Sequence, residues 1–338
     1  MSVLKHSLKA VFTGLALVAF ASSAWAATTL RLSTLDKPGS DGEIAAQELA
    51  KRVEAGTDGR VKIKVYPASQ LGDWVEVHDQ VVGGAVDIAM QPLATSSDRR
   101  LAIGWFPYLY TSYEEAEKAN IRGGFVDEIV SQVTADQGLK LLGIFGVGMG
   151  GAGFAKDVAD PGNPDVKRTL KVRVWPGGTT HRVMMERFGY SVATVPWAEL
   201  FTAMQTGVVD GQIGGTAEMT YDNLKEATKT WVQFNDHFES NWIFMNAKRF
   251  QSLDPADQKV LEDVGQQITK ERFAQLKVRD AEQLQRLKDF GVKVVELDQA
   301  QLDALSKAVR SDVWPKIADE LGDEAYQRVK QAVGSGGS

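Results

Sequence analysis

Two short segments of the chain alternate apolar and polar residues with a period of two, which is typical of β-strands. In KVRVWP (171–176) the alternation places Lys171, Arg173 and Trp175 on one face and the two valines on the other. KIKVYP (62–67) has almost the same pattern. The sequence therefore predicts two similar strands far apart in the chain. It also raises the question of what the face that carries the arginine contacts.

The pattern around the earlier segment predicts alternating strands and helices. Apolar runs predict strands over 28–35, 61–67 and 86–90, and helical spacing of apolar residues predicts helices over 43–57 and 73–82. Helices of this length can serve as crossovers between parallel strands. The first part of the chain is therefore predicted to form a parallel sheet with helices on its faces.

The same order recurs in the middle of the chain. Strands are predicted over 166–176, 191–196 and 208–214, and helices over 179–189 and 197–207. The recurrence predicts an α/β protein with two lobes of similar construction.

A third region is dominated by helix-forming residues. Asp254 and Pro255 are typical of a helix N-terminus, and from there to Phe290 the chain has no further proline and a single glycine, Gly265. One continuous helix would be about 50 Å long and could brace both lobes. Two shorter helices broken near the glycine are the alternative.

The C-terminal region is predicted to hold one more strand and one more helix. The strand covers 291–297, and the helix covers about 299–332, with a break at Pro315. The tail GSGGS (334–338) has the composition of an expression linker.

The N-terminus resembles a secretory signal peptide. Residues 1–26 hold basic residues, a short apolar stretch and the small-x-small sequence Ala24-Trp25-Ala26, which predicts cleavage before Ala27. A membrane anchor is the alternative, but an apolar core of about 12 residues is shorter than the roughly 20 that a span needs. The sequence therefore predicts export to the periplasm.

Composition excludes several kinds of chemistry. The 338 residues include no cysteine, which rules out thiolate metal sites, thiol nucleophiles and disulfides, and the net charge of −6 argues against nucleic acid as a partner. The four histidines show no metal-ligand spacing, and no catalytic triad or carboxylate pair can be identified, so we expect no metal, no cofactor and no enzymatic activity.

The segment GVGMGG (146–151) matches a dinucleotide-binding motif but is interpreted differently. That motif works where its glycines begin a helix, whereas here they are expected to lead into a loop (152–164). We expect instead a backbone stretch that lies close to a ligand or at a junction between lobes.

Arg173 is the strongest candidate for ligand binding, because a guanidinium is always charged and matches the geometry of a carboxylate. An exposed arginine on an edge strand is the alternative. Five tryptophans lie near predicted element ends, where parallel sheets form ligand crevices, although each alone is as compatible with a core position. They are Trp74, Trp105, Trp175, Trp197 and Trp242.

The segment PWAELFTAMQTGVVDGQ (196–212) resembles the signature of the solute-binding proteins of tripartite ATP-independent periplasmic (TRAP) transporters, the DctP-like family. Other segments that agree with the family lie at 46–73, 82–87, 106–110 and 170–174 and in the helix from Pro255. The resemblance implies a two-lobe periplasmic-binding-protein fold (type II-like) with a long helix bracing both lobes. It also implies a carboxylate ligand in the cleft and delivery to the small and large permease subunits.

The resemblance also implies lobe boundaries and site residues. Lobe I would comprise 27–151 plus about 240–280, and lobe II 152–239 plus about 281–333. Arg173 falls on the family's carboxylate clamp, and Trp197 falls where an aromatic ring walls the pocket. The further ligand-binding candidates are Trp74, Gln91, Gly150, Trp175, Gly214 and Glu239.

Two positions depart from the family pattern. Gly150 stands near the usual second arginine, and Gly214 replaces an asparagine that often contacts ligand. Both glycines are expected to leave space, which favours a bulky or aromatic acid. Glu239 lies near a position that can line the cleft, which allows a ligand with an amine or hydroxyls.

Three other functions stay open at this stage. An ABC-type binding protein would share the lobes but not the continuous helix after Pro255, and a periplasmic enzyme would need a nucleophile and a base. A role in presenting ligand to a sensor is compatible with binding.

Overall fold

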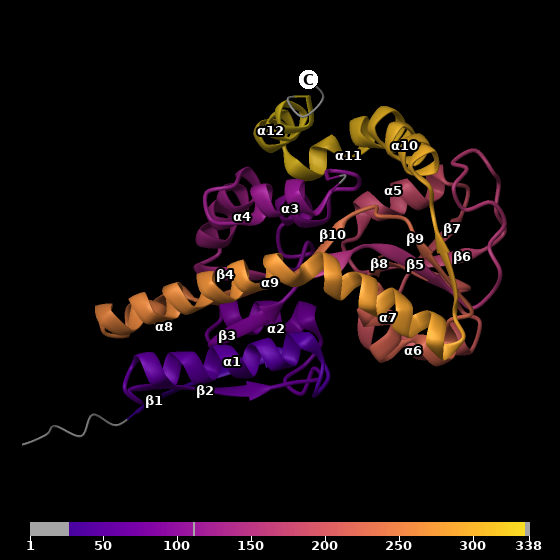
Figure 1. Ribbon diagram of the computed structural model, residues 1–338. Coiled ribbons are helices and arrows are strands. Elements are labelled where there is room, and N and C mark those ends of the chain that lie inside the picture. The colour runs from indigo at the N-terminus through magenta and orange to yellow at the C-terminus, as the bar shows by residue number, and fades with distance from the viewer. Residues whose placement is uncertain (1–26, 111, 335–338) are drawn as a thin grey trace, which may run out of the picture.

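The structure is a computed structural model that describes residues 27–110 and 112–334. Its strands form two mixed sheets, one of five and one of six strands, which lie in two lobes (Figure 1). The predicted signal peptide (1–26) and the linker residues 335–338 lie outside the described residues. In the described part, no helix combines the length and the apolarity that a membrane crossing requires.

The first sheet contains the predicted parallel unit. β1 pairs in parallel with β2 and β3, so the predicted β-α-β-α-β order is confirmed. β10 pairs antiparallel with β3 and β4 and completes the order β2-β1-β3-β10-β4. The strands are β1 (Thr28–Thr34), β2 (Val61–Tyr66), β3 (Ile88–Gln91), β4 (Leu139–Met149) and β10 (Phe238–Asn246), and the crossover helices are α1 (Asp41–Gly56) and α2 (Trp74–Val82).

The second sheet repeats this construction. β6 pairs in parallel with β7 and β8, and β5 is antiparallel to β8 and β9, in the order β11-β9-β5-β8-β6-β7. The strands are β5 (Gly151–Phe154), β6 (Lys171–Val174), β7 (Ser191–Thr194), β8 (Gly211–Gly215), β9 (Thr230–Gln233) and β11 (Lys293–Glu296), and the crossover helices are α5 (Thr179–Arg187) and α6 (Trp197–Gln205).

Among the described strands the chain passes between the sheets three times. Two of these passages are adjacent crossovers, from β4 to β5 and from β9 to β10, and the third runs through the long helix between β10 and β11. The amide of Gly150 donates to the carbonyl of His237 at 2.8 Å, and the amide of Asn235 donates to the carbonyl of Gly150 at 2.9 Å. The glycine-rich segment 146–151 is therefore a junction between lobes. The loop expected after it is wrong for its first residues, since Gly151–Phe154 pairs with β8 and β9 as strand β5.

A single helix, α9 (Pro255–Phe290, 36 residues), crosses both lobes (Figure 1). Asp254 caps its N-terminus and Gly291 ends it with φ 101°, as the sequence pattern indicated. The alternative of a break at Gly265 is wrong. Glycine is required at this position because the helix packs closely against β4. A Cβ on Gly265 would lie 2.6 Å from the carbonyl oxygen of Leu142.

Ion pairs join α9 to both lobes. Arg52 of α1 pairs with Glu271 at 2.9 Å, and Arg286 pairs at 3.6 Å with Asp222 of α7 (Ala217–Asn223). Both pairs are partly exposed and contribute little each. Apolar residues of α9 that pack under the first sheet, among them Leu261 and Ile268, therefore supply most of the attachment.

The C-terminal helices differ from the prediction in where they break. α10 (Gln299–Ala308) leads into a π-helical turn, η3 (Val309–Val313), and then directly into α11 (Trp314–Leu321). Pro315 is tolerated because the first turn of a helix needs no amide donor. The clear break lies at Gly322, with φ 77°, before α12 (Asp323–Gly334).

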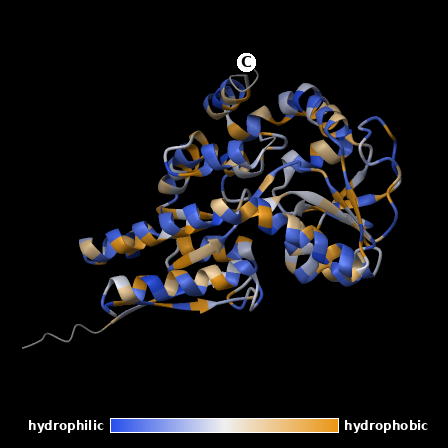
Figure 2. Cartoon of the chain, in the orientation of Figure 1, coloured by the Kyte–Doolittle hydropathy of each residue, from blue (hydrophilic) through white to orange (hydrophobic). Residues whose placement is uncertain are grey.

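Five further helices complete the described fold, and one of them, η1 (Arg99–Trp105), is largely buried. Figure 2 shows apolar residues concentrated on the strands, whereas the helices carry both apolar and polar residues. The five helices are η1, α3 (Tyr113–Asn120), α4 (Phe125–Asp136), η2 (Lys225–Ala227) and α8 (Ala247–Gln251).

The close approach of α9 to β4 leads to a stability prediction for Gly265→Ala. In a free helix alanine is favoured over glycine by about 1 kcal/mol. Here the added Cβ would meet backbone, and overpacking of this kind costs about 1–3 kcal/mol. Since the propensity gain offsets part of this cost, we expect the free energy of unfolding, measured by denaturant titration, to fall by up to about 2 kcal/mol.

Gly83→Ala is the matched control. Gly83 ends α2 with φ −74° and is exposed, and the nearest atom to an added Cβ would be 3.4 Å away. This variant should be neutral or stabilised by up to about 1 kcal/mol. A Gly265→Ala protein as stable as Gly83→Ala would contradict the packing argument.

Candidate functional site

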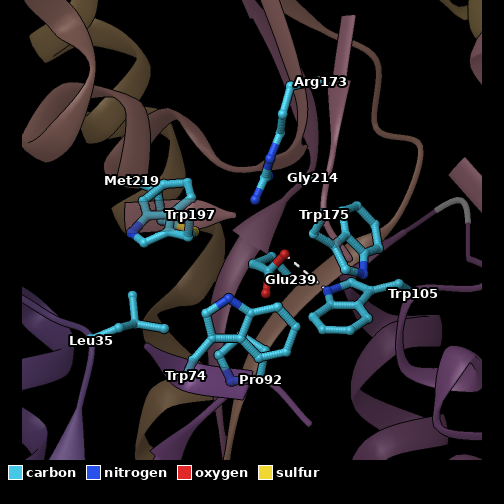
Figure 3. A pocket seen from close by; sticks show the side chains of 10 residues that line it. All are labelled: Leu35, Trp74, Pro92, Trp105, Arg173, Trp175, Trp197, Gly214, Met219 and Glu239. Atoms are coloured by element: carbon cyan, nitrogen blue, oxygen red, sulfur yellow. Dashed lines mark hydrogen bonds between the residues drawn. The ribbon is translucent and has the colours of Figure 1, made fainter. Parts of the chain in front are cut away.

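A cavity of about 30 Å³ lies between the two sheets (Figure 3). Many of its wall residues lie at the ends of parallel strands or in the loops and helix starts that follow them, which is where ligands bind in open α/β sheets. One wall residue, Glu239, belongs to β10, which returns from one lobe to the other. The lining residues are Leu35, Trp74, Pro92, Trp105, Arg173, Trp175, Trp197, Gly214, Met219 and Glu239.

Arg173 on β6 is a buried charge with few partners. Its side chain is 1% exposed, and its Nε donates to the carbonyl of Val195 at 2.8 Å, which fixes its direction. Within the described chain, no carboxylate lies within 4 Å of it, and its terminal nitrogens make no hydrogen bond. Burial lowers the pKa of Arg173 to about 9, although the negative charges of Asp73 and Glu239 act to raise this pKa. Such a group is stabilised by an anion that enters the cavity.

Four indoles surround the end of the arginine. Trp74 and Trp105 make an edge-to-face contact at 6.0 Å, and Trp105 and Trp175 lie 5.1 Å apart with an interplanar angle of 54°. The guanidinium carbon of Arg173 is 5.8 Å from the ring centre of Trp197, within reach of a cation–π attraction. The cavity is therefore mostly apolar, with one guanidinium extending into it (Figure 3).

Glu239 supplies a carboxylate to the same cavity. Its Oε2 accepts hydrogen bonds from Nε1 of Trp105 at 2.9 Å and from Nε2 of His237 at 3.1 Å. Its Oε1 is buried and has no hydrogen-bond partner among the described residues. Glu239 is 2% exposed, so bulk solvent does not reach this oxygen.

Behind Glu239 lies a chain of buried titratable groups. Nδ1 of His237 is 2.7 Å from Oδ2 of Asp236, and Nε2 of His181 is 3.0 Å from the same oxygen. Burial alone would lower the pKa of His237, but Asp236 and Glu239 outweigh it and raise the pKa to about 10. Burial lowers the pKa of His181. His237 is therefore an imidazolium between two carboxylates, whereas His181 is neutral.

His181, Asp236 and His237 also bring metal-ligand atoms within 4.8 Å of one another. The spacing rule used on the sequence could not find this group, because it joins α5 to a distant crossover. The distances between Asp236 and both rings are those of hydrogen bonds, and a protonated His237 cannot ligate a metal. The arrangement is that of a hydrogen-bonded chain that fixes Glu239.

The structure brings together six of the eight predicted site residues and leaves two outside the cavity lining. Gln91 lies behind the wall, where its Nε2 donates to the carbonyl of Trp74 at 2.6 Å and holds the start of α2. Gly150 lies at the crossover against the ring of His237. The six residues that line the cavity are Trp74, Arg173, Trp175, Trp197, Gly214 and Glu239.

The expectation that Gly150 and Gly214 leave space for ligand is wrong. A Cβ on Gly150 would overlap the imidazole of His237, and one on Gly214, where φ is 91°, would overlap the indole of Trp175. Both glycines are needed so that a neighbouring ring can approach the backbone. The departures from the family pattern therefore admit side chains of the protein itself.

Four lining residues are not among the site residues that the sequence predicts, although the sequence carries a signal for most of them. Leu35 directly follows β1 and Pro92 directly follows β3, at the carboxyl ends where parallel sheets bind ligands. Trp105 is one of the five tryptophans near predicted element ends. Met219 of α7 carries no such signal.

The charge on His237 leads to a pH prediction. Because its folded-state pKa of about 10 exceeds the reference value of 6.5, its stabilising contribution is full below about pH 6.5 and is lost as the pH rises through about 10. We expect the melting temperature of the wild-type protein to fall more steeply over this window than that of His237→Gln. The melting temperature of the wild type should fall by about 2 °C or more beyond the fall for His237→Gln. A change of 1 kcal/mol in stability shifts the melting temperature of a domain of this size by about 2–4 °C.

His181→Gln is the control for this measurement. It removes a buried ring that also contacts Asp236 but is already neutral, so it should lower stability without changing the slope. Equal slopes for the wild type and His237→Gln would show that His237 carries no charge in the folded protein.

Comparisons with known proteins agree with this geometry. The C4-dicarboxylate-binding periplasmic protein DctP of Rhodobacter capsulatus is 26% identical over 303 residues, covering 88% of this chain and 87% of the relative. A TRAP periplasmic solute-binding protein from Desulfovibrio salexigens, with bound orotic acid, has a TM-score of 0.81 at 21% identity and covers 90% of this chain and 97% of its own. One from Sulfurospirillum deleyianum, with bound succinate, has a TM-score of 0.79 at 19% identity and covers 90% and 98%.

The fold predicted from the resemblance, two α/β lobes with a bracing helix, is thus confirmed. A family model described as "Bacterial extracellular solute-binding protein, family 7" matches residues 32–320, which is most of the chain. The chain therefore belongs to the family 7 bacterial extracellular solute-binding proteins, the DctP family.

Proposed function

We propose that this protein captures a small organic acid in the periplasm by binding its carboxylate to Arg173, and delivers it to the membrane permease of a TRAP transporter. The observation that carries the proposal is the buried guanidinium of Arg173. Its terminal nitrogens face an apolar cavity between two lobes and have no hydrogen-bond partner among the described residues. A carboxylate would accept two parallel hydrogen bonds from those nitrogens in a site with little water. Charge-assisted bonds of this kind contribute about 1.5–3 kcal/mol.

The size of the cavity indicates that binding involves motion of the lobes. One water molecule needs about 10–15 Å³, so a cavity of about 30 Å³ holds on the order of two waters and no organic acid. The lobes are held together across the cavity by contacts such as the hydroxyl of Thr95 to the carbonyl of Gly177 at 3.0 Å. Ligand would enter a more open form that bends at the two crossovers. It would then favour closure of the lobes around itself, with a cavity larger than this one, by contacting both lobes.

The known ligands of relatives support a carboxylate of modest size. The solved relatives hold orotic acid and succinate, both of which carry carboxylates. Gly150 and Gly214 give no reason to propose a bulky ligand, because the rings of His237 and Trp175 occupy the space beside these glycines. The indoles would instead contact the carbon skeleton of the acid.

The family and the N-terminal segment support the proposed location and partner. The signal-like residues 1–26 support export and cleavage before Ala27. The uninterrupted α9 favours a TRAP system over an ABC-type system, which would be expected to lack such a helix. A gene neighbourhood with a small and a large permease gene would support this assignment, and an adjacent ATPase gene would contradict it. Presentation of ligand to a sensor is compatible with the same capture step.

Ligand is best sought by a thermal-shift screen of organic acids that includes succinate and orotate. A compound that binds only the folded state raises the melting temperature. We expect Arg173→Ala to weaken the best binder about tenfold to a few hundredfold in titration calorimetry, from a loss of about 1.5–3 kcal/mol. Arg173→Lys should also weaken it, because an ammonium cannot replace both arms of the guanidinium.

Arg168→Lys is the matched control, because Arg168 is also largely buried but bonds to carbonyls of its own lobe, including Asp160 at 2.6 Å. It should leave the affinity for the acid unchanged. Unchanged affinity in both Arg173 variants would remove Arg173 from the site and overturn the proposal.

A further inference from the structure

Glu239 presents a hydrogen-bond acceptor to the cavity that the protein leaves unused. Oε2 is held by Trp105 and His237, while Oε1 is buried and unpartnered. A buried acceptor without a donor costs about 1–3 kcal/mol, and more when it is charged. In Figure 3 the carboxylate of Glu239 lies among the indoles, below the end of the Arg173 side chain.

The fixed position of Glu239 indicates that this acceptor is built into the site. Its other oxygen receives two hydrogen bonds, one of them from the imidazolium of His237, whose charge is balanced in turn by Asp236. The carboxylate therefore cannot turn away from the cavity to satisfy Oε1 without breaking both bonds.

The charges around the cavity are already negative in sum before an acid binds. Arg173 and His237 are positive, while Asp236, Glu239 and Asp73 are negative. Asp73 caps α2 through Oδ1, and its Oδ2 is also buried without a partner. A plain carboxylate would add a further negative charge to this buried group, whereas a ligand with its own positive charge would not.

The walls of the cavity favour a cation as well. Indole faces attract positive charge, by about 0.5–2 kcal/mol for each favourable contact. Trp74, Trp105, Trp175 and Trp197 all line the cavity, and Trp74 and Trp105 border the side on which Glu239 lies.

We propose that the ligand is a small zwitterion of the amino-acid type, whose carboxylate binds Arg173 and whose N–H-bearing ammonium group donates to Oε1 of Glu239. This inference rests on the proposed capture of a carboxylate and adds the second functional group of the ligand. A primary or secondary ammonium meets the need of Oε1 for a donor. A quaternary ammonium has no N–H, and a plain or dicarboxylic acid leaves Oε1 unpaired.

The test compares matched pairs of probes that differ in the nitrogen. Calorimetry on the wild-type protein would measure L-proline against cyclopentanecarboxylate, and β-alanine against butyrate, with proline betaine as the probe that lacks N–H. In at least one pair we expect the amine to bind about tenfold or more tightly than its nitrogen-free partner, as for a hydrogen bond to a charged group. Proline betaine should bind more weakly than proline.

Glu239→Gln should bring the ratio of the two affinities within that pair close to one. Arg173→Ala should weaken the binding of both compounds. Asp257→Asn is the control for loss of a buried carboxylate, because Asp257 pairs with Arg60 at 2.8 Å at the start of α9 and does not line the cavity. It should leave the ratio unchanged. If Glu239→Gln does not fold, as judged by its unliganded melting curve, the wild-type ratios decide the question.

Each other outcome overturns the inference. Nitrogen-free acids that bind as tightly as their amine partners, or more tightly, contradict it, as does an unchanged ratio in Glu239→Gln. A screen in which hydroxy acids or dicarboxylates bind and no zwitterion raises the melting temperature also contradicts it. In those cases binding that still depends on Arg173 would leave the proposed function intact, whereas affinity independent of Arg173 would overturn both.

Discussion

The structure depends on a buried guanidinium that makes no ion pair with any carboxylate in the described chain. Burying a charge costs several kcal/mol unless a partner of opposite sign is close, and no carboxylate in the described chain lies within 4 Å of Arg173. Its direction is fixed by one backbone carbonyl and its environment by indoles. An arrangement of this kind is unfavourable for a protein that keeps the cavity empty. It is favourable for one whose closed form is completed by an anion, which is the thermodynamic basis of capture.

The fold supplies the geometry for that capture with two kinds of element. The parallel strands of each lobe end at the same cleft, so residues from β6, α2, α6 and η1 meet there although they are distant in sequence. The crossovers and α9 join the lobes. α9 packs tightly on the first sheet through Gly265 and reaches the second lobe through Asp222 and Arg286, so it limits the directions in which the lobes can separate.

Much of this was predictable from the sequence, because the decisive signals are local. Period-two runs and helical spacing give the strands and helices, and the alternation in 171–176 identifies Arg173 beside Trp175. What could not be predicted depends on contacts between distant segments. From the sequence, Gly214 is expected to leave space for ligand, but in the structure the ring of Trp175 occupies that space. The chain from His181 to Glu239 joins a helix to a crossover more than fifty residues away, and no spacing rule detects it.

The junction between lobes and the ligand cavity share the same residues. Gly150 bonds to the carbonyl of His237, and its lack of a side chain lets the imidazole pack against the backbone. That imidazole carries the charge that holds Glu239 in the wall. A change in backbone direction at the crossover would therefore move His237 and, through it, the acceptor that faces the ligand. Since Arg173 is carried by β6 in the other sheet, the spacing between Arg173 and Glu239 is set by the same crossover about which the lobes would close. The ligand that spans both groups would fix that spacing, and recognition and closure would be one event.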